Sequence, residues 1–561
     1  MNFLAQQKKV IFLVALFALL WCPLSVFLSI GADMSFLFKV TCALILVITL
    51  IRPILGIGLF LLLMPFFGGS KPQDVHTIRF LILLSTVVFA GGLSLIARVI
   101  YSNSKVKLDF SNPLTFALLV YWLVAAGSLV SIPPNEVVLS IFDFRSSRVL
   151  DFLNLSESSA IYPYLAFFTL TSSLLLGLII VNLACTTKKA LLIIGFFLLG
   201  LLLTVVLGLL DYYDFINLNF IRPWYFLAND GESYRFQHLT SVFGNPGWYA
   251  QYLVLGAPAL LVILTIDCSK RLKLVSLICL MVITEFCIIL IYQRGGWLSY
   301  PLTLIITWFC IYVLDADLEN FSGCMKAAKN SLLKISISLP LTIIISISLV
   351  YLTARSQPEN RQQLSGFAQR AESITNVNDR LKYWEPAFLM ASLHPLFGPG
   401  LESFASQYAK LYVEPGHRYV QTPKYDVMPY AGSAHNLYFQ TVAGKGLLGL
   451  LSLFGIFAAV LTLVWRGIFS DAAKPVLTQY QRLILMMMLA YSCALAIYGN
   501  VGEIFYSPIG YIPFVLFYAI SIGTVPPAYK LSIRFRVWVL GFLVFSFLVH
   551  LYLELGIRFA G

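Results

Sequence analysis

Long apolar runs recur along the whole 561-residue chain, and they restrict its fold more than any other feature. A helix of about 20 apolar residues crosses the hydrocarbon core of a bilayer, which is roughly 30 Å thick. A helix also satisfies its own backbone polar groups where no water can reach them. The sequence predicts spans at about 10–31, 35–51, 54–67, 79–100, 113–132, 162–184, 188–210, 247–266, 272–292, 297–314, 332–353, 447–465, 482–499, 506–524 and 535–556. The predicted fold class is an all-α polytopic membrane protein with 14 or 15 transmembrane helices, because two short runs meet at Arg52-Pro53.

The composition excludes an ordinary soluble protein. Hydrophobic residues make up 59% of the chain and charged residues 11%, and the mean hydropathy is +0.84, far from the average soluble domain. The first apolar run is longer than the apolar segment of a secretory signal peptide, about 7 to 15 residues, and no clear small-residue cleavage site follows it. We therefore expect the first run to remain as a membrane helix.

Positive charges fall on alternate loops, and this bias predicts the orientation, because short cytoplasmic loops retain Lys and Arg. The loops on the predicted cytoplasmic side carry Lys8, Lys9, Lys105, Lys107, Lys188, Lys189, Lys270, Arg271, Lys273, Lys326, Lys329, Arg466, Lys474, Lys530, Arg534 and Arg536. The opposite side then receives about 132–161, 211–246, the turn at Arg294 and the large external loop 354–434. Much of the net charge of +12 follows from this bias, so the lipid bilayer is the predicted partner and nucleic acid is not. None of the nine cysteines lies in the long external loops, and neither a disulfide framework nor a CxxC metal site is predicted.

A histidine stands where the longest polar stretch returns to an apolar run, in Ser433-Ala434-His435-Asn436. Histidine changes charge near neutral pH, so this position suits proton transfer beside lipid. The alternative is that His435 merely caps the next helix, with Asn436 beside it. Three other histidines fall on the same predicted face and are expected to be loop or positioning residues: His238, His394 and His417.

A second candidate is Arg294 in the tight turn Gln293-Arg294-Gly295-Gly296-Trp297. A guanidinium is permanently charged and matches phosphate geometry, and glycines let a backbone approach a ligand closely. The alternative is an interfacial arginine that reaches toward water, with Trp297 anchored in the aromatic belt.

Two further segments lie on the predicted external side. The first contains Arg235 and the turn Asn245-Pro246-Gly247, whose amides at a helix start could favour an anion, although Asn-Pro-Gly is more often only a turn. The second contains Arg380 and Trp384, near an expected helix start, and is followed by Pro395-Leu396-Phe397-Gly398-Pro399-Gly400.

Together these segments resemble the superfamily of O-antigen ligases, Wzy-type O-antigen polymerases and bacterial pilin oligosaccharyltransferases. The resemblance covers about 235–450. It rests on Phe243-Gly244-Asn245-Pro246, Arg294-Gly295-Gly296-Trp297, Arg380 with Pro395–Gly400, and Ala434-His435-Asn436-Leu437-Tyr438 leading to Gly446-Leu447-Leu448-Gly449.

The resemblance implies a GT-C-like helical fold in the bacterial inner membrane and an inverting, metal-independent glycosyltransferase without a cofactor. The implied donor is an undecaprenyl diphosphate-linked glycan, and the implied acceptor is a hydroxyl group on a glycan or lipid A core. His435 would be the general base, and Arg294, Arg380 and Arg235 would bind the donor diphosphate. The supporting residues would be Asn436, Asn245, Gly295, Gly296 and Trp384.

The chemistry is consistent on general grounds. A positioned imidazole that accepts a hydroxyl proton contributes roughly 10²–10⁴ in rate, and fixed guanidinium groups stabilise the charge that develops on a leaving diphosphate. Ligase and polymerase differ in acceptor; we favour the ligase, and a protein acceptor is a third possibility. A transporter or flippase of lipid-linked glycans is the rival class, and it should place its functional charges near the midplane. A polysaccharide-binding or cell-division scaffold remains a further alternative.

The chain divides into predicted N-terminal transmembrane helices (1–210), a catalytic core (211–465) and C-terminal transmembrane helices (466–561). Two charges fall in apolar surroundings, Lys445 and Glu285. If a helix begins at His435, Lys445 lies about 15 Å deeper at 1.5 Å per residue and needs a partner inside the bundle. A Lys445–Glu285 pair is one hypothesis.

Overall fold

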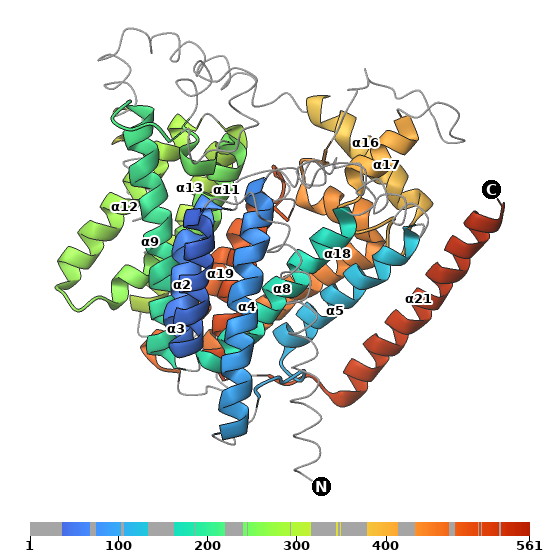
Figure 1. The fold of residues 1–561 in the computed structure, drawn as a ribbon, viewed down its shortest axis with the longest axis horizontal. Coiled ribbons are helices and arrows are strands. Elements are labelled where there is room, and N and C mark those ends of the chain that lie inside the picture. Colours follow the sequence, from blue (N-terminus) through green and yellow to red (C-terminus); the bar gives the residue numbers. More distant parts are fainter. Residues whose placement is uncertain are drawn as a thin grey trace.

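The computed structural model describes residues 36–67, 75–101, 106–132, 162–184, 186–218, 239–243, 245–291, 293–315, 344–345, 348, 378–412, 432–469, 477–502, 504–505, 508–526 and 529–560. Every regular element in these ranges is a helix, and nine of the described helices are long and apolar enough to cross a membrane. The predicted all-α polytopic membrane fold is confirmed (Figure 1). The predicted span at 10–31 and nearly all of the one at 332–353 lie outside the described residues.

Most of the helices follow the predicted apolar runs, whereas α16 and α17 lie in the predicted external loop. In chain order they are α2 (Phe36–Ile51), α3 (Pro53–Leu63), α4 (Val75–Tyr101), α5 (Pro113–Ser128), α8 (Tyr162–Leu183), α9 (Thr187–Tyr212), α11 (Pro246–Gly256), α12 (Lys270–Leu290), α13 (Arg294–Asp315), α16 (Asn378–Leu393), α17 (Phe404–Tyr412), α18 (Leu437–Val464), α19 (Gln479–Tyr498), α20 (Pro508–Thr524) and α21 (Ile533–Ala560). Short 3₁₀ segments follow α3 (Met64–Phe66), α5 (Leu129–Ser131) and α11 (Ala257–Thr265), another lies at Ser241–Phe243, and a π-helical turn (Trp465–Phe469) follows α18.

Asparagine side chains start three of these helices. Asn112, Asn245 and Asn436 accept hydrogen bonds from backbone N–H groups in the first turns of α5, α11 and α18, which satisfies donors that a helix start leaves without partners. Proline follows Asn112 and Asn245, where its missing N–H costs nothing. α18 begins ten residues before the expected 447, because its glycine-rich first turns do not form an apolar run.

The bundle is held together by four extensive helix pairs. α5 packs along α18, α8 along α20, α13 along α19, and α3 along α9. α21 lies at the edge of the bundle (Figure 1), and much of its apolar surface is exposed, as expected for a helix that faces lipid. α16 and α17 lie at one end of the bundle, at the top of Figure 1, whereas α4 and the start of α21 reach the bottom.

α18 is broken in its third turn, at Gly446, and the segment 395–400 fills the break. Gly446 has φ +64° and ψ −167°, a conformation that glycine adopts at little cost. The freed N–H groups of Leu447 and Leu448 donate to the carbonyl oxygens of Pro395 and Leu396 at 2.8 and 3.1 Å. A side chain at Gly446 would collide with the Leu396 carbonyl. The break therefore fixes the segment 395–400 against α18.

Candidate functional site

The residues just before α18 place the imidazole of His435 at the surface. His435 is exposed, and its φ of +50° is left-handed, a region in which histidine is several-fold enriched among non-glycine residues. The following residue, Asn436, is buried and caps the helix. The His435 ring packs edge-on against Tyr383 of α16, with ring centroids 4.9 Å apart. The helix cap at Asn436 thus fixes the backbone next to His435, while the His435 ring lies at the surface.

Arg380, in the first turn of α16, ties that helix to the histidine. Its Nη1 donates to the carbonyl oxygen of His435 at 3.0 Å and to that of Val501 at 3.1 Å. A guanidinium carries five donors in a rigid fork, so it can hold two carbonyls and keep a fixed direction. Arg380 therefore lies beside His435 although 55 residues separate them.

Arg294 is the first residue of α13 and is exposed. A Cβ atom at Gly295 would lie 2.8 Å from Val501 Cγ2, and one at Gly296 would lie 3.2 Å from Ala250 Cβ. The two glycines were expected to allow close approach of a ligand, and the close approach in the structure is to Val501 and Ala250. The consequence is that the start of α13 lies against the same Val501 that accepts from Arg380.

Asn245 lies at the start of α11 and caps this helix. Its side chain accepts from the backbone N–H groups of Gly247 and Trp248 at 2.7 and 3.3 Å, which fixes the turn. The carbonyl oxygen of Gly247 accepts from the Tyr498 hydroxyl at 2.9 Å. The Asn-Pro-Gly segment is therefore both a helix cap and a contact with the end of α19.

All four regions meet at residues 498–502, which we call the α19 turn. Asn500 O accepts from Asn436 Nδ2 at 3.1 Å, and Gly499 O accepts from the Leu437 N–H at 2.7 Å. Together with the contacts of Tyr498 and Val501, these bonds connect the starts of α11, α13, α16 and α18. Sequence reasoning missed this turn. Gly499 and Asn500 indicate only a helix end, and nothing in the sequence pairs them with the other segments.

Trp384 fixes α16 on α18 through Phe439, whereas the ring contact of His435 is with Tyr383. Its ring lies 4.8 Å from that of Phe439, and Phe388 contacts the same ring at 5.0 Å. Nearby, burial raises the pKa of Tyr408 on α17, with a smaller contribution from Tyr383. Tyr408 thus remains a neutral phenol.

A buried polar network runs beneath His435. Gln440 accepts from the Ala434 N–H at 2.8 Å and donates to Glu402 Oε2 at 2.8 Å. Glu402 acts electrostatically on Lys445, which is 1% exposed and donates to the Tyr121 hydroxyl at 2.6 Å. The network therefore connects the residue before His435 with the break in α18.

Lys445 faces the bundle interior, as predicted for a charged side chain at its depth in the helix. Its partners are Tyr121, whose ring centroid is 4.6 Å from Nζ, and Glu402. Glu285 is buried in α12 and is an electrostatic neighbour of Tyr300. The hypothesis of a Lys445–Glu285 pair is wrong: between these two described residues no such pair forms.

The remaining candidates lie elsewhere. Arg235, His238 and His417 fall outside the described residues. His394 belongs to a separate cluster, where its Nδ1 lies 2.5 Å from Glu554 Oε1. Within the described ranges, no group of three or more His, Cys, Asp or Glu side chains could hold a metal ion.

These features define a polytopic membrane protein with arginine and histidine side chains gathered at one end of its helical bundle. Residues 275–454 match the model of the O-antigen ligase family, Wzy_C. Over this range, about a third of the chain, the predicted family resemblance is confirmed. No curated protein matches the chain.

The matched range lies inside the predicted core 211–465 and includes Arg294, Arg380 and His435; Asn245 and Arg235 lie outside it. A member of this family is a membrane protein of polysaccharide biosynthesis, of the O-antigen ligase or polymerase type. The family implies glycosyl transfer with lipid-linked glycan substrates.

Proposed function

We propose that this protein is an inverting glycosyltransferase of the bacterial inner membrane, which transfers a glycan from undecaprenyl diphosphate to a hydroxyl acceptor on the periplasmic side. The observation that carries the proposal is the convergence of Arg294, Arg380 and His435 around the α19 turn, within the region matched by the O-antigen ligase family. Residues far apart in sequence thereby bring an imidazole and two arginines to one end of the bundle, which supports the proposal.

In the proposed reaction, the acceptor oxygen attacks C1 of the donor sugar from the face opposite the diphosphate. The new C1–O bond forms as the bond to the diphosphate breaks, and this inverts the anomeric centre. His435 takes the proton of the acceptor hydroxyl. The diphosphate leaves with the bonding electron pair, and Arg294 and Arg380 stabilise its charge. Arg235 is a further proposed ligand of the diphosphate.

The surroundings of His435 support its role as the base. Its backbone oxygen accepts from Arg380, and Asn436 and Leu437 are bonded to the α19 turn. The ring is exposed, so a bulky glycan acceptor can reach it. A base held by its backbone keeps its position while its side chain remains accessible. This matters because small misplacements at a reacting centre are costly in rate.

We propose the ligase as the particular activity, with a lipid A core as acceptor. The test is a strain that lacks this protein, complemented with wild type, His435→Ala, Arg294→Ala or, as matched control, Arg271→Ala on the predicted cytoplasmic side. A ligase predicts accumulation of full-length lipid-linked polymer in the deletion strain and no transfer to lipid A. Accumulation of single repeat units would instead indicate a polymerase. Unchanged transfer by well-expressed His435→Ala would remove His435 as the base.

A transporter of lipid-linked glycans is the second candidate, and the break in α18 beside buried Lys445 favours it, because transporters use broken helices with charges at the midplane. Against it, the segment 395–400 bonds the backbone groups freed at the break. Purified protein in detergent, given lipid-linked glycan and acceptor, separates the two candidates. An enzyme forms the product without a membrane, whereas a transporter forms none.

A further inference from the structure

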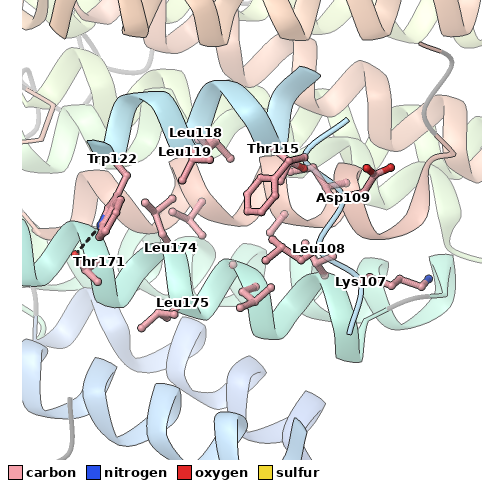
Figure 2. Close-up of a pocket in the computed structure, with 17 residues that line it drawn as sticks. Lys107, Leu108, Asp109, Thr115, Leu118, Leu119, Trp122, Thr171, Leu174 and Leu175 are labelled. Atoms are coloured by element: carbon pink, nitrogen blue, oxygen red, sulfur yellow. Dashed lines mark hydrogen bonds between the residues drawn. The ribbon is translucent and has the colours of Figure 1, made fainter. Parts of the chain in front are cut away.

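A cavity of about 270 Å³ lies between α5, α8 and α20, away from the site around His435 (Figure 2). Its walls are the first turns of α5 and facing parts of α8 and α20, and they are formed mainly by apolar side chains such as Leu118, Leu119, Trp122, Leu174 and Leu178. An apolar cavity of about 150 Å³ stays dry and binds small apolar molecules. A larger apolar cavity in a membrane protein is therefore suited to hydrocarbon.

One end of the cavity is polar, because Lys107 and Asp109 lie there (Figure 2). The Lys107 side chain extends away from the apolar lining (Figure 2). Asn182 fixes the backbone of Lys107 by accepting from its N–H at 2.6 Å and donating to its carbonyl oxygen at 3.2 Å. The cation is thus attached to a rigid edge of the cavity.

The second charged group at this end is Asp109, and its neighbours stabilise the carboxylate. It accepts from the Ser111 hydroxyl at 2.6 Å and from the Ser111 N–H at 2.8 Å. The hydroxyl bond is the main cause that lowers the pKa of Asp109, and Lys530 and Arg536 lower it further. Lys530 and Arg536 act on the Asp109 carboxylate, and Lys107 lines the same cavity, so three cations and one carboxylate leave a positive balance for an anionic group.

One polar atom of the lining also lacks a partner. Thr115 Oγ1 is buried, and no hydrogen-bond partner for it exists among the described residues. A buried hydroxyl without a partner is destabilising, because folding has removed its hydrogen bonds to water. A ligand with an oxygen acceptor between its charged end and its hydrocarbon would remove this cost.

We propose that this cavity binds one acyl chain of an anionic phospholipid, with the phosphate at Lys107 and an ester carbonyl accepting from Thr115. Lys530 and Arg536 add to the positive field at the headgroup. The site lies on the predicted cytoplasmic side and is separate from the proposed transfer site, so it does not depend on the proposed activity.

The test uses purified full-length protein in nanodiscs that contain phosphatidylglycerol with a diazirine near the end of one acyl chain. After illumination, mass spectrometry should find the label on peptides that contain 115–122 and 171–178. Leu119→Trp fills the cavity and should reduce this labelling at least fivefold. The matched control is Leu199→Trp on α9, where the leucine is 47% exposed and does not line the cavity.

A separate experiment tests the contribution of the Lys107 charge. Lys107→Glu should reduce labelling by phosphatidylglycerol severalfold, and the exposed Lys188→Glu should not. Thr115→Val, which keeps the side-chain shape, should weaken labelling two- to threefold without affecting folding. Equal labelling of these peptides by diazirine phosphatidylcholine, stronger displacement of the label by undecaprenyl phosphate than by phosphatidylglycerol, or unchanged labelling in Leu119→Trp would overturn the proposal.

Discussion

Two histidine regions of this bundle use their side chains in opposite ways. Around His435, backbone groups make the structural bonds, and the exposed ring contacts Tyr383. Around His550, the imidazole ring itself makes the structural bonds. Its Nε2 lies 2.9 Å from Ser131 Oγ, and its Nδ1 lies 3.8 Å from Glu554 Oε1, which also contacts His394. A histidine held by its backbone keeps its ring accessible for chemistry, whereas one held by its ring connects helices.

The second region has the composition of a hydrolase triad, with Ser131, His550 and Glu554 in line. Its hydrogen bonds do not support that activity. The Ser131 hydroxyl donates to the carbonyl oxygen of Gly398 at 2.7 Å, and a hydroxyl has one proton to donate. His550 Nε2 therefore donates to Ser131 and cannot act as its base. The cluster is better understood as the attachment of α21 to the segment 395–400.

The largest expected effect comes from replacing the accessible histidine. His435→Ala should lower the rate of glycan transfer by about 10²–10⁴, the range for loss of a general base, with little change in unfolding temperature because the ring is exposed. In vitro transfer and a thermal melt of the purified protein measure the two quantities. More than half of wild-type activity would contradict the role of His435.

Arg380 should give the next largest effect, because it both positions His435 and carries a proposed charge for the diphosphate. Arg380→Ala should reduce transfer by roughly 10²-fold or more, in the range seen when one charge-stabilising donor is lost. Arg380→Lys keeps the charge but cannot hold two carbonyls from one planar group, so it should restore only part of the rate. Full restoration by lysine would mean that the two backbone bonds contribute nothing.

Replacing Lys445 tests whether the buried network beneath His435 stabilises the fold. Lys445→Met keeps the length of the side chain and removes its donor, which leaves the Tyr121 hydroxyl and Glu402 without this partner. The expected cost is about 1–3 kcal/mol of stability, read as a lower melting temperature. A second replacement, Tyr121→Phe, removes the hydroxyl partner of the buried Lys445 and should also lower the melting temperature. Equal stability of Lys445→Met and wild type would show that the network is not needed for the fold.

Much of the helical framework could be predicted from the sequence, and the connections between its parts could not. Apolar runs and Asn-Pro pairs fix helices such as α5 and α11 locally, because span length and capping depend on neighbouring residues. The apolar run predicted for α18 began only at 447, because Gly444 and Gly446 interrupt its pattern; a helix start at His435 was considered on other grounds. The partner of Lys445 was missed for another reason: Tyr121 is 324 residues away, and no local periodicity specifies such a contact.

His550 should affect stability and leave the chemistry nearly unchanged. His550→Ala removes a 1% exposed side chain bonded to Ser131, so about 1–3 kcal/mol of stability should be lost. The rate per folded molecule should remain within a few-fold of wild type. Glu554→Gln offers a milder change in the same cluster. A loss of activity as large as that of His435→Ala, with an unchanged melting temperature, would erase the contrast between the two regions.

The smallest expected effect concerns how firmly the His435 ring is oriented. An edge-on aromatic contact such as that with Tyr383 contributes about 0.5–1.5 kcal/mol, which corresponds to roughly 2- to 13-fold in rate if the whole amount is lost at the transition state. Tyr383→Phe keeps the ring and should retain nearly full transfer, whereas Tyr383→Leu should lose activity within that range. If phenylalanine is as impaired as leucine, the hydroxyl matters and the edge-on packing is not what orients the base. If both variants are fully active, the orientation of His435 depends on its backbone alone.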